Sequence, residues 1–331
     1  MSEYWQRLED LDTFSISWRE LKIPLHAGLF LITFFTTTLA GVDWIGKDPL
    51  NLLNFAYGLT YSVSLLAILG SHEFGHFFYS LKHKVRATLP CFIPFPFIPG
   101  MLNFGTLGAI IRTKTPVPSR KAVFDIGVSG PIVGFIVSVA VLIVGFTLLP
   151  SREHILQIHP NYNFTTNSSG VLDGLPLAFG NTILFKILEI IFTNPHTQFV
   201  PPMTEIYNYP LLCTGWFGLF VTAMNLLPIG QLDGGHMIYA MFGRAHRKVA
   251  RIFFYIILAI GILGLLPLVG VNIDFGWTGW LFWSAILFFV VKLDHPPVMD
   301  STPLDKKRMI IGWLTILIFI VSFSPTPFTI S

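Results

Sequence analysis

Residues 53–69 read LNFAYGLTYSVSLLAIL, and the pentapeptide His72-Glu73-Phe74-Gly75-His76 follows after two further residues. No charged side chain precedes Glu73 in this apolar run, which has the length and composition of a transmembrane helix. On such a helix His72 and His76 are four residues apart and share one face, where two imidazoles can bind one metal ion. Glu73 lies beside them, placed to take a proton from a metal-bound water. Ionisable groups at membrane depth are costly and indicate a functional site.

A catalytic zinc site usually has three protein ligands and one open position for water, so a third ligand must come from elsewhere in the chain. Two Asp-Gly sequences are candidates. Leu172-Asp173-Gly174 follows a polar stretch and is typical of an ordinary turn. Asp233 follows the apolar run 211–227 and is the better candidate, because a buried carboxylate at membrane depth needs a partner such as zinc.

Asp233 belongs to a longer motif, NLLPIGQLDGGH at residues 225–236, which is more distinctive than the first. Together the two motifs resemble the site-2 protease family of intramembrane metalloproteases, over roughly residues 53–236. The resemblance implies that His72, His76 and Asp233 hold one zinc ion per chain. It further implies that Glu73 is the general base and that Asn225 helps to hold the substrate or the developing oxyanion. His236 is not implied as a ligand, and we expect a structural or supporting role for it.

The composition is that of a polytopic membrane protein, with 53% hydrophobic and 12% charged residues. We expect an all-α membrane protein of about seven transmembrane helices, with a small membrane-associated β-hairpin near the active site. The net charge is only +3, and no basic run indicates a nucleic-acid partner. Glycines 127, 130 and 134 of the third segment indicate close helix packing, for which an ordinary bundle suffices. The apolar segments cover roughly residues 24–42, 53–80, 122–149, 209–238, 252–270, 276–292 and 309–324.

Lysine and arginine are distributed unevenly among the gaps between these segments. Eighteen of them fall in the gaps 1–23, 81–121, 239–251 and 292–308, and only Lys47, Arg152 and Lys186 fall elsewhere. Because basic loops stay on the cytoplasmic side of a membrane, we expect a cytoplasmic N-terminus and, with seven spans, a C-terminus on the other side. The second segment then runs toward the cytoplasm, so the active site lies nearer that side and receives its water from there.

An unusual connection, residues 89–121, joins the second and third segments. It begins LPCFIPFPFIPG, too rich in proline for a helix, and the alternation in FGTLGAIIR at 104–112 predicts a strand. We expect a partly membrane-dipping hairpin beside the active site; a lipid-facing connector is the alternative. An exposed strand edge could hold a substrate segment extended by strand addition. The family resemblance implies the same use for the strand 105–111, with Gly105, Thr106, Leu107 and Gly108 as substrate-binding residues.

The remaining segments indicate one catalytic domain. We expect a cytoplasmic N-terminal segment at 1–23, a transmembrane protease domain at 24–324 with its catalytic core at about 53–238, and a short tail at 325–331. No loop has the length of the PDZ domain that many site-2 proteases carry, and this form is typical of a bacterial inner membrane or a plastid membrane. Residues 183–192 are expected at the membrane surface. Loop roles without metal binding are expected for His83, His154, His159, His196, His246 and His295.

The implied function is hydrolysis of peptide bonds in or near transmembrane segments of membrane proteins, in regulated intramembrane proteolysis. The implied partners are membrane-protein substrates, the lipid bilayer and an upstream site-1-type protease. A metal-ion transporter is one alternative, but it would be expected to offer several sites in series or a histidine-rich loop. A catalytically silent relative that only binds membrane proteins is another, although no ligand or base position has been lost. A further alternative is that His72 and His76 are ordinary core histidines with Glu73 nearby. These three polar groups would then lie in hydrocarbon without a function.

Overall fold

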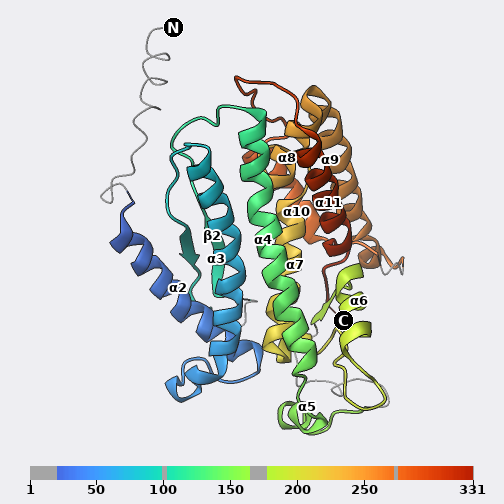
Figure 1. The fold of residues 1–331 in the computed structure, drawn as a ribbon. Helices are drawn as coiled ribbons and strands as arrows, with labels where there is room; N and C mark the ends of the chain where they lie inside the picture. The colour runs from blue at the N-terminus through green and yellow to red at the C-terminus, as the bar shows by residue number, and fades with distance from the viewer. Residues whose placement is uncertain (1–20, 99–102, 165–176, 272–274, 331) are drawn as a thin grey trace.

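Helices dominate the structure, a computed structural model that describes residues 21–98, 103–164, 177–271 and 275–330 (Figure 1). The early elements are α2 (Ile23–Trp44), η1 (Leu52–Gly58), α3 (Leu59–Lys82), β1 (Cys91–Pro94), β2 (Thr106–Ile110), α4 (Arg120–Thr147) and α5 (Arg152–Ile158). The middle elements are β3 (Leu177–Phe179), α6 (Ile183–Phe192), η2 (Ile206–Asn208), α7 (Pro210–Asn225), α8 (Asp233–Phe242) and η3 (Gly243–Ala245). The last are α9 (His246–Leu263), η4 (Leu266–Val269), α10 (Gly279–Ile286), the π-helical turn η5 (Leu287–Val291), α11 (Lys306–Ser322) and β4 (Phe328–Ile330).

Four helical segments in the described part of the chain are long and apolar enough to cross a membrane. Three of them correspond to the predicted segments at 24–42, 53–80 and 122–149. Shorter apolar helices follow at Pro210–Asn225 and Gly279–Val291, and α11 has 17 residues. The chain is therefore a mostly helical integral membrane protein, as predicted. The four segments are Ile23–Trp44, Leu52–Lys82, Arg120–Thr147 and Asp233–Val269.

The predicted fourth segment, 209–238, is not one continuous helix. Helix α7 ends at Asn225, and α8 begins at Asp233. In the turn between them Pro228 has no N–H to continue a helix, and Gly230 has φ +57°, which side chains with a β-carbon rarely adopt. The break puts both implied site residues of this motif at helix ends, Asn225 at the end of α7 and Asp233 at the start of α8.

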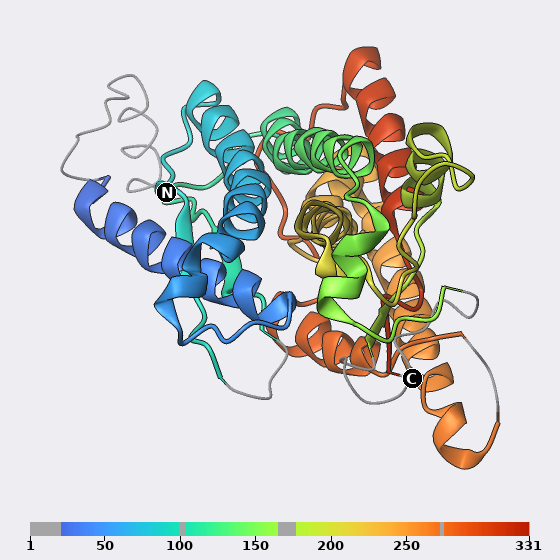
Figure 2. The same cartoon turned by 90° about the horizontal axis from the view of Figure 1, so that it is seen from below.

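Helix α7 lies in the middle of the bundle, with α3 and α4 on one side and α9, α10 and α11 on the other (Figure 2). Its core is aromatic: Trp216 is fully buried and packs edge-on against Phe179 and stacks on Phe220. Helices α3 and α4 approach very closely, because a β-carbon on Gly75 would lie 2.7 Å from the carbonyl oxygen of Ser129. This close approach brings α4 against the His72–His76 face of α3.

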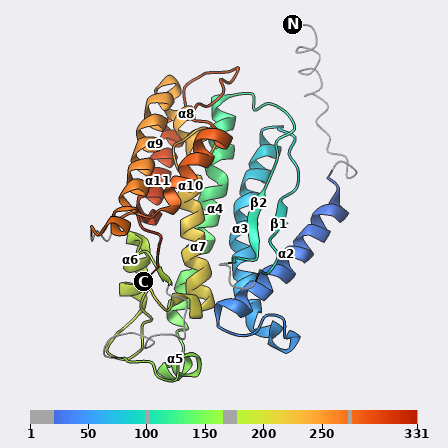
Figure 3. The ribbon, with the colours of Figure 1, turned by 180° about the vertical axis from the view of Figure 1, so that it is seen from behind.

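The predicted hairpin is present. Strands β1 and β2 pair antiparallel, with Cys91 opposite Ile110 and an irregularity between Phe92 and Pro94. The hairpin lies between α2 and α3, as the view from behind shows (Figure 3). Thr36 of α2 donates a hydrogen bond of 2.7 Å to the carbonyl of Gly105, which fixes the hairpin to the first helix.

A second small sheet packs on α7, where Phe179 and Phe328 contact Trp216. Strand β3 pairs antiparallel with β4, with Ala178 opposite Thr329, so part of the predicted tail 325–331 is paired with the loop between α4 and α7. The predicted short helix at 183–192 is α6, with Phe185 and Leu188 buried. Residues 1–20 of the predicted N-terminal segment and the alternative ligand sequence Leu172-Asp173-Gly174 lie outside the described residues.

Candidate metal centre

The two histidines of α3 and the aspartate that opens α8 meet at one point. Nε2 of His72 lies 3.1 Å from Nε2 of His76. Oδ2 of Asp233 lies 3.4 Å from the first nitrogen and 3.3 Å from the second. These three residues form a group whose possible ligand atoms all lie within 4.8 Å of one another.

This triangle fits a tetrahedral zinc ion. Zinc binds imidazole nitrogen and carboxylate oxygen at about 2.0–2.2 Å, so the ligand atoms of a tetrahedral site are separated by about 3.4 Å. The three separations between His72, His76 and Asp233 are close to that value. Two neutral imidazoles with one carboxylate also form a donor set typical of catalytic zinc, which leaves a fourth position for water or substrate.

The carbonyl of Ile126 in α4 fixes the ring of His76. Nδ1 of His76 lies 2.7 Å from this oxygen, and a carbonyl can only accept, so Nδ1 carries the proton. Nε2 is then free of its proton and presents a lone pair toward the ligand triangle. Such a backbone partner is the usual means of orienting a metal-binding histidine.

The glycines of α4 make room for the two histidines. A β-carbon on Gly130 would lie 2.1 Å from Nε2 of His76, and one on Gly134 would lie 3.1 Å from the Cβ and Nδ1 of His72. Sequence reasoning assigned these glycines to ordinary bundle packing and missed their place at the site. Their spacing matches that of the two histidines, and this match was the available signal.

Glu73 lies between the histidine helix and the hairpin. Its side chain is buried, at 8% exposure, as are His72 at 4% and His76 at 6%. The backbone of Ile111, the residue after β2, lies close enough to the Glu73 carboxyl to interact with it. The hairpin therefore ends beside Glu73, and its last strand reaches the site.

Asn225 and Asp233 approach the site from the ends of α7 and α8. Nδ2 of Asn225 lies 3.3 Å from Nε2 of His72. Asp233 is in the first turn of α8, where the free N–H groups of a helix favour a negative charge. The turn between the two residues is tight, since a β-carbon on Gly234 would lie 2.0 Å from the carbonyl of Leu226. The structure thus places Asn225 next to His72, one of the two histidines that meet Asp233.

Of the four predicted substrate-binding residues, Gly105 directly precedes β2, and Thr106, Leu107 and Gly108 are its first three residues. Gly105 is packed on α2, Thr106 donates from Oγ1 to the carbonyl of Ile93 at 2.8 Å, and Gly108 has φ +102° with open space around its α-carbon. Leu107 is 68% exposed. Within its two-stranded sheet β2 pairs only with β1, so its second edge has no partner strand there.

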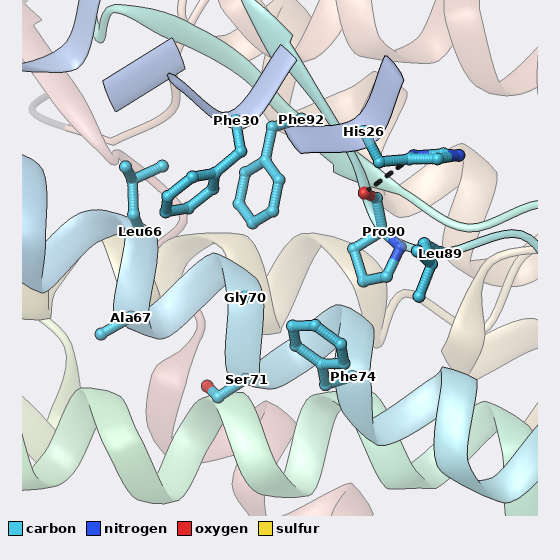
Figure 4. A pocket seen from close by; sticks show the side chains of 10 residues that line it. All are labelled: His26, Phe30, Leu66, Ala67, Gly70, Ser71, Phe74, Leu89, Pro90 and Phe92. Carbon is cyan, nitrogen blue, oxygen red and sulfur yellow. Dashed lines mark hydrogen bonds between the residues drawn. The ribbon is translucent and has the colours of Figure 1, made fainter. Parts of the chain in front are cut away.

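An apolar cavity of about 460 Å³ adjoins this site, between α2, α3 and β1 (Figure 4). Phe74, the neighbour of Glu73, forms part of its wall, and another part is formed by Phe30 and Phe92, which pack edge-on with ring centroids 5.1 Å apart. His26 is turned to the hairpin, where its Nδ1 lies 3.2 Å from the carbonyl of Pro90. The cavity is suited to hydrocarbon groups.

Several histidines that were expected to have only loop roles make specific contacts. His295 lies 2.7 Å from His236, and His83 lies 2.8 Å from Asp125 of α4. His246 begins α9 and is buried. Neither of the two contacts could be found from spacing, because their partners are 59 and 42 residues away along the chain.

Comparison with known proteins gives a consistent set of relatives. A family model described as Peptidase family M50 matches residues 60–268. The probable zinc metalloprotease EGY2, chloroplastic, of Oryza sativa subsp. indica is 27% identical over 307 residues, or 91% of this chain and 50% of the relative.

Two further relatives bear a similar name. Probable zinc metalloprotease EGY1, chloroplastic, of Oryza sativa subsp. japonica is 29% identical over 242 residues, 71% of this chain and 36% of its own. The Arabidopsis thaliana protein of that name is 32% identical over 214 residues, 64% of this chain and 34% of its own. The chain thus spans between a third and a half of the length of these relatives. No solved structure matches it significantly.

Proposed function

The chain belongs to peptidase family M50, the site-2 protease family, and we propose that it is a zinc-dependent intramembrane endopeptidase. The observation that carries the proposal is the triangle of His72, His76 and Asp233 ligand atoms next to the buried carboxylate of Glu73. Among the described residues this is the one such group of possible ligands. A single centre favours hydrolysis over metal transport, which would be served by several sites in series.

Each side chain of the site has a distinct role in the proposed reaction. His72, His76 and Asp233 would hold the zinc ion, which would lower the pKa of a water molecule and polarise the scissile carbonyl. Glu73 takes the proton from the attacking water and passes it to the amide nitrogen as the C–N bond breaks. Asn225 donates from Nδ2 to the carbonyl oxygen as negative charge develops there.

The proposed substrates are transmembrane segments of other membrane proteins. A helical segment has its backbone amides in its own hydrogen bonds, so it must be extended before a peptide bond can enter the site. The unpartnered edge of β2 could pair with such a segment through Gly105, Thr106, Leu107 and Gly108. The proximity of the Ile111 backbone to Glu73 supports this assignment, because the end of that strand then lies beside the general base.

The proposed topology has seven crossings and a cytoplasmic N-terminus, with 1–23 as a cytoplasmic segment, 24–324 as the protease domain and 325–331 as a tail. Helix α3 ends and α4 begins at one end of the bundle, the upper end in Figure 1. The basic gaps 81–121 and 239–251 adjoin this end, which supports its cytoplasmic placement. The site then lies nearer the cytoplasm, in a bacterial inner membrane or a plastid membrane, and an upstream site-1-type protease would prepare the substrate.

The experiment that tests the proposal compares the native chain with Glu73→Gln in detergent, with a single-span membrane protein as substrate. We expect about one zinc ion per chain in both proteins. Cleavage by the native chain should stop on chelation, and the rate should be lower by a factor on the order of 10²–10⁴ or more in the variant. Glu153→Gln, at an exposed position of α5, is the matched control and should cleave normally.

Three results would contradict the proposal. If neither the native chain nor the variant bound zinc, the ligand assignment would fall. If the zinc-loaded native chain cleaved none of a panel of single-span substrates, or if Glu73→Gln cleaved at the native rate, the assigned activity or the assigned base would fall.

A further inference from the structure

The segment 292–298, which we name the strap, crosses the turn and the helix that carry Asp233. It makes three hydrogen-bonded contacts with that region. The N–H of Gly230 donates to the carbonyl of Leu293 at 3.2 Å. His236 contacts His295 at 2.7 Å, and the N–H of Val298 donates to the hydroxyl of Tyr239 at 3.1 Å. The contacts therefore begin three residues before Asp233 and continue after it.

The contact between the two histidines has a definite direction. Nδ1 of His295 lies 2.6 Å from the carbonyl of Pro296, so this nitrogen must carry the proton. Nε2 of His295 is then an acceptor, and Nδ1–H of His236 donates to it. The ring of His295 is 7% exposed and stacks on Tyr239 with centroids 4.1 Å apart and planes 11° apart. His295 is thus held by two residues of α8.

Backbone packing holds the other end of the strap. Lys292 follows the π-helical turn η5 and has φ +63°, a conformation that a residue with a β-carbon keeps only where its surroundings enforce it. Its carbonyl oxygen presses on Gly230, where a β-carbon would lie 1.9 Å from it. Gly230 itself has φ +57°. Two residues with positive φ angles, Lys292 and Gly230, thus meet at the base of the turn that leads to Asp233.

We propose that the strap is a positioning element for the metal ligand Asp233 and that His295 is its principal positioning residue. The inference rests on the proposed function, since it assumes that Asp233 binds zinc. Asp233 opens a helix of ten residues that is joined to α7 through a turn without regular structure, so its carboxylate depends on outside contacts for its place. The strap supplies these contacts on both sides of it. Groups that support a metal ligand from outside commonly change metal affinity by about 10–100-fold when they are removed.

The test measures zinc affinity by competition with a chelator, in the full chain in detergent. His295→Ala should raise the zinc dissociation constant by about 10–100-fold. Tyr239→Phe keeps the stacked ring, loses only the hydroxyl, and should produce a smaller change in the same direction. Arg247→Ala is the matched control. Arg247 lies 3.8 Å from Asp294, the neighbour of His295, and this ion pair is weak because both side chains are exposed. Its zinc affinity should equal that of the native chain.

Thermal unfolding with and without zinc separates positioning from general destabilisation. A ligand raises the unfolding temperature in proportion to the logarithm of its affinity, so His295→Ala should reduce the gap between zinc-loaded and zinc-free protein. Excess zinc should also restore cleavage. An equal fall in both unfolding temperatures, with unchanged zinc affinity in His295→Ala and Tyr239→Phe, would overturn the positioning role alone. A native chain that binds no zinc would overturn it together with the proposed function.

Discussion

Gly130 of α4 and His76 of α3 lie so close that a β-carbon on the glycine would be 2.1 Å from the Nε2 atom of the histidine. That nitrogen is the one that faces His72 and Asp233. No side chain can therefore occupy position 130 while His76 keeps its place. The small residue is a requirement of the metal site rather than of helix packing alone.

Gly130→Ala should consequently displace the His76 ring and weaken zinc binding by a factor on the order of a hundred or more. Zinc content after dialysis and the zinc dissociation constant measure the effect. Gly28→Ala, in α2, is the matched control, because no atom lies within 4 Å of the place of its β-carbon. Equal zinc affinity in the two variants would contradict the requirement.

Hydropathy and motif spacing predict the outline of this molecule because both depend on local sequence. The apolar runs at 24–42, 53–80 and 122–149 correspond to helices since a span must be apolar along its whole length. The prediction of one segment at 209–238 was wrong, because the helix is broken between Asn225 and Asp233. Pro228 and Gly230 are the local signals of this break. An average over a long apolar window outweighs two residues.

Contacts between distant segments leave no such local signal. The position of His295 beside His236 depends on how η5 returns the chain to α8, and the prediction of a loop role for His295 did not include that contact. The same applies to the carbonyl of Ile126, which any residue could supply and which no side-chain pattern reveals. What the sequence leaves open is therefore the set of groups that support the ligands.

Asn225→Ala should lower kcat by a factor on the order of 10²–10³ with little change in KM or in zinc content, because it removes a donor that acts on the developing negative charge. The amide lies 3.3 Å from the His72 ligand atom, so zinc must be measured in the same preparation. Thr222→Val, one turn earlier in α7, tests for nonspecific effects. Loss of zinc from Asn225→Ala would show that the residue supports the ligands instead.

Leu107→Asp should raise KM by about threefold to tenfold while kcat and zinc content stay constant, since cross-strand side-chain pairs contribute about 0.2–1 kcal/mol each and a charge also costs desolvation. Leu107 is exposed on β2, where the substrate strand would lie. The matched control is Leu53→Asp, at an exposed position of η1. An unchanged KM, or an equal rise in both variants, would count against substrate binding at β2.

Arg308→Met should lower the free energy of unfolding by about 2 kcal/mol, because it leaves the Asp125 carboxylate with His83 alone in a partly buried place. The guanidinium normally donates from Nε to Oδ1 at 2.8 Å and from Nη2 to Oδ2 at 2.7 Å. Combining it with Asp125→Asn should recover part of the loss. Denaturant or thermal unfolding measures both proteins, and additive losses would argue that the two residues act independently.

Glu205 should make the region around α5 less stable as pH rises. Burial raises the pKa of this carboxyl from 4.5 to about 7, against the opposing hydrogen bond from Asn208. The folded state then binds more protons than the unfolded state between these pKa values, so the free energy of unfolding falls across pH 4.5 to 7. The fall is on the order of 3 kcal/mol at most.

Glu205→Gln should remove this part of the pH dependence, which the difference in unfolding temperature between pH 5 and pH 8 measures. The ionisable neighbours of Glu205 are present in native and variant chains alike, so the comparison isolates the carboxyl; they are His159, Tyr162, Tyr207 and Tyr209. Glu153→Gln should keep the native pH dependence, because its side chain is exposed. If Glu205→Gln lost as much stability at pH 8 as the native chain does, the buried carboxyl would not be the group that titrates.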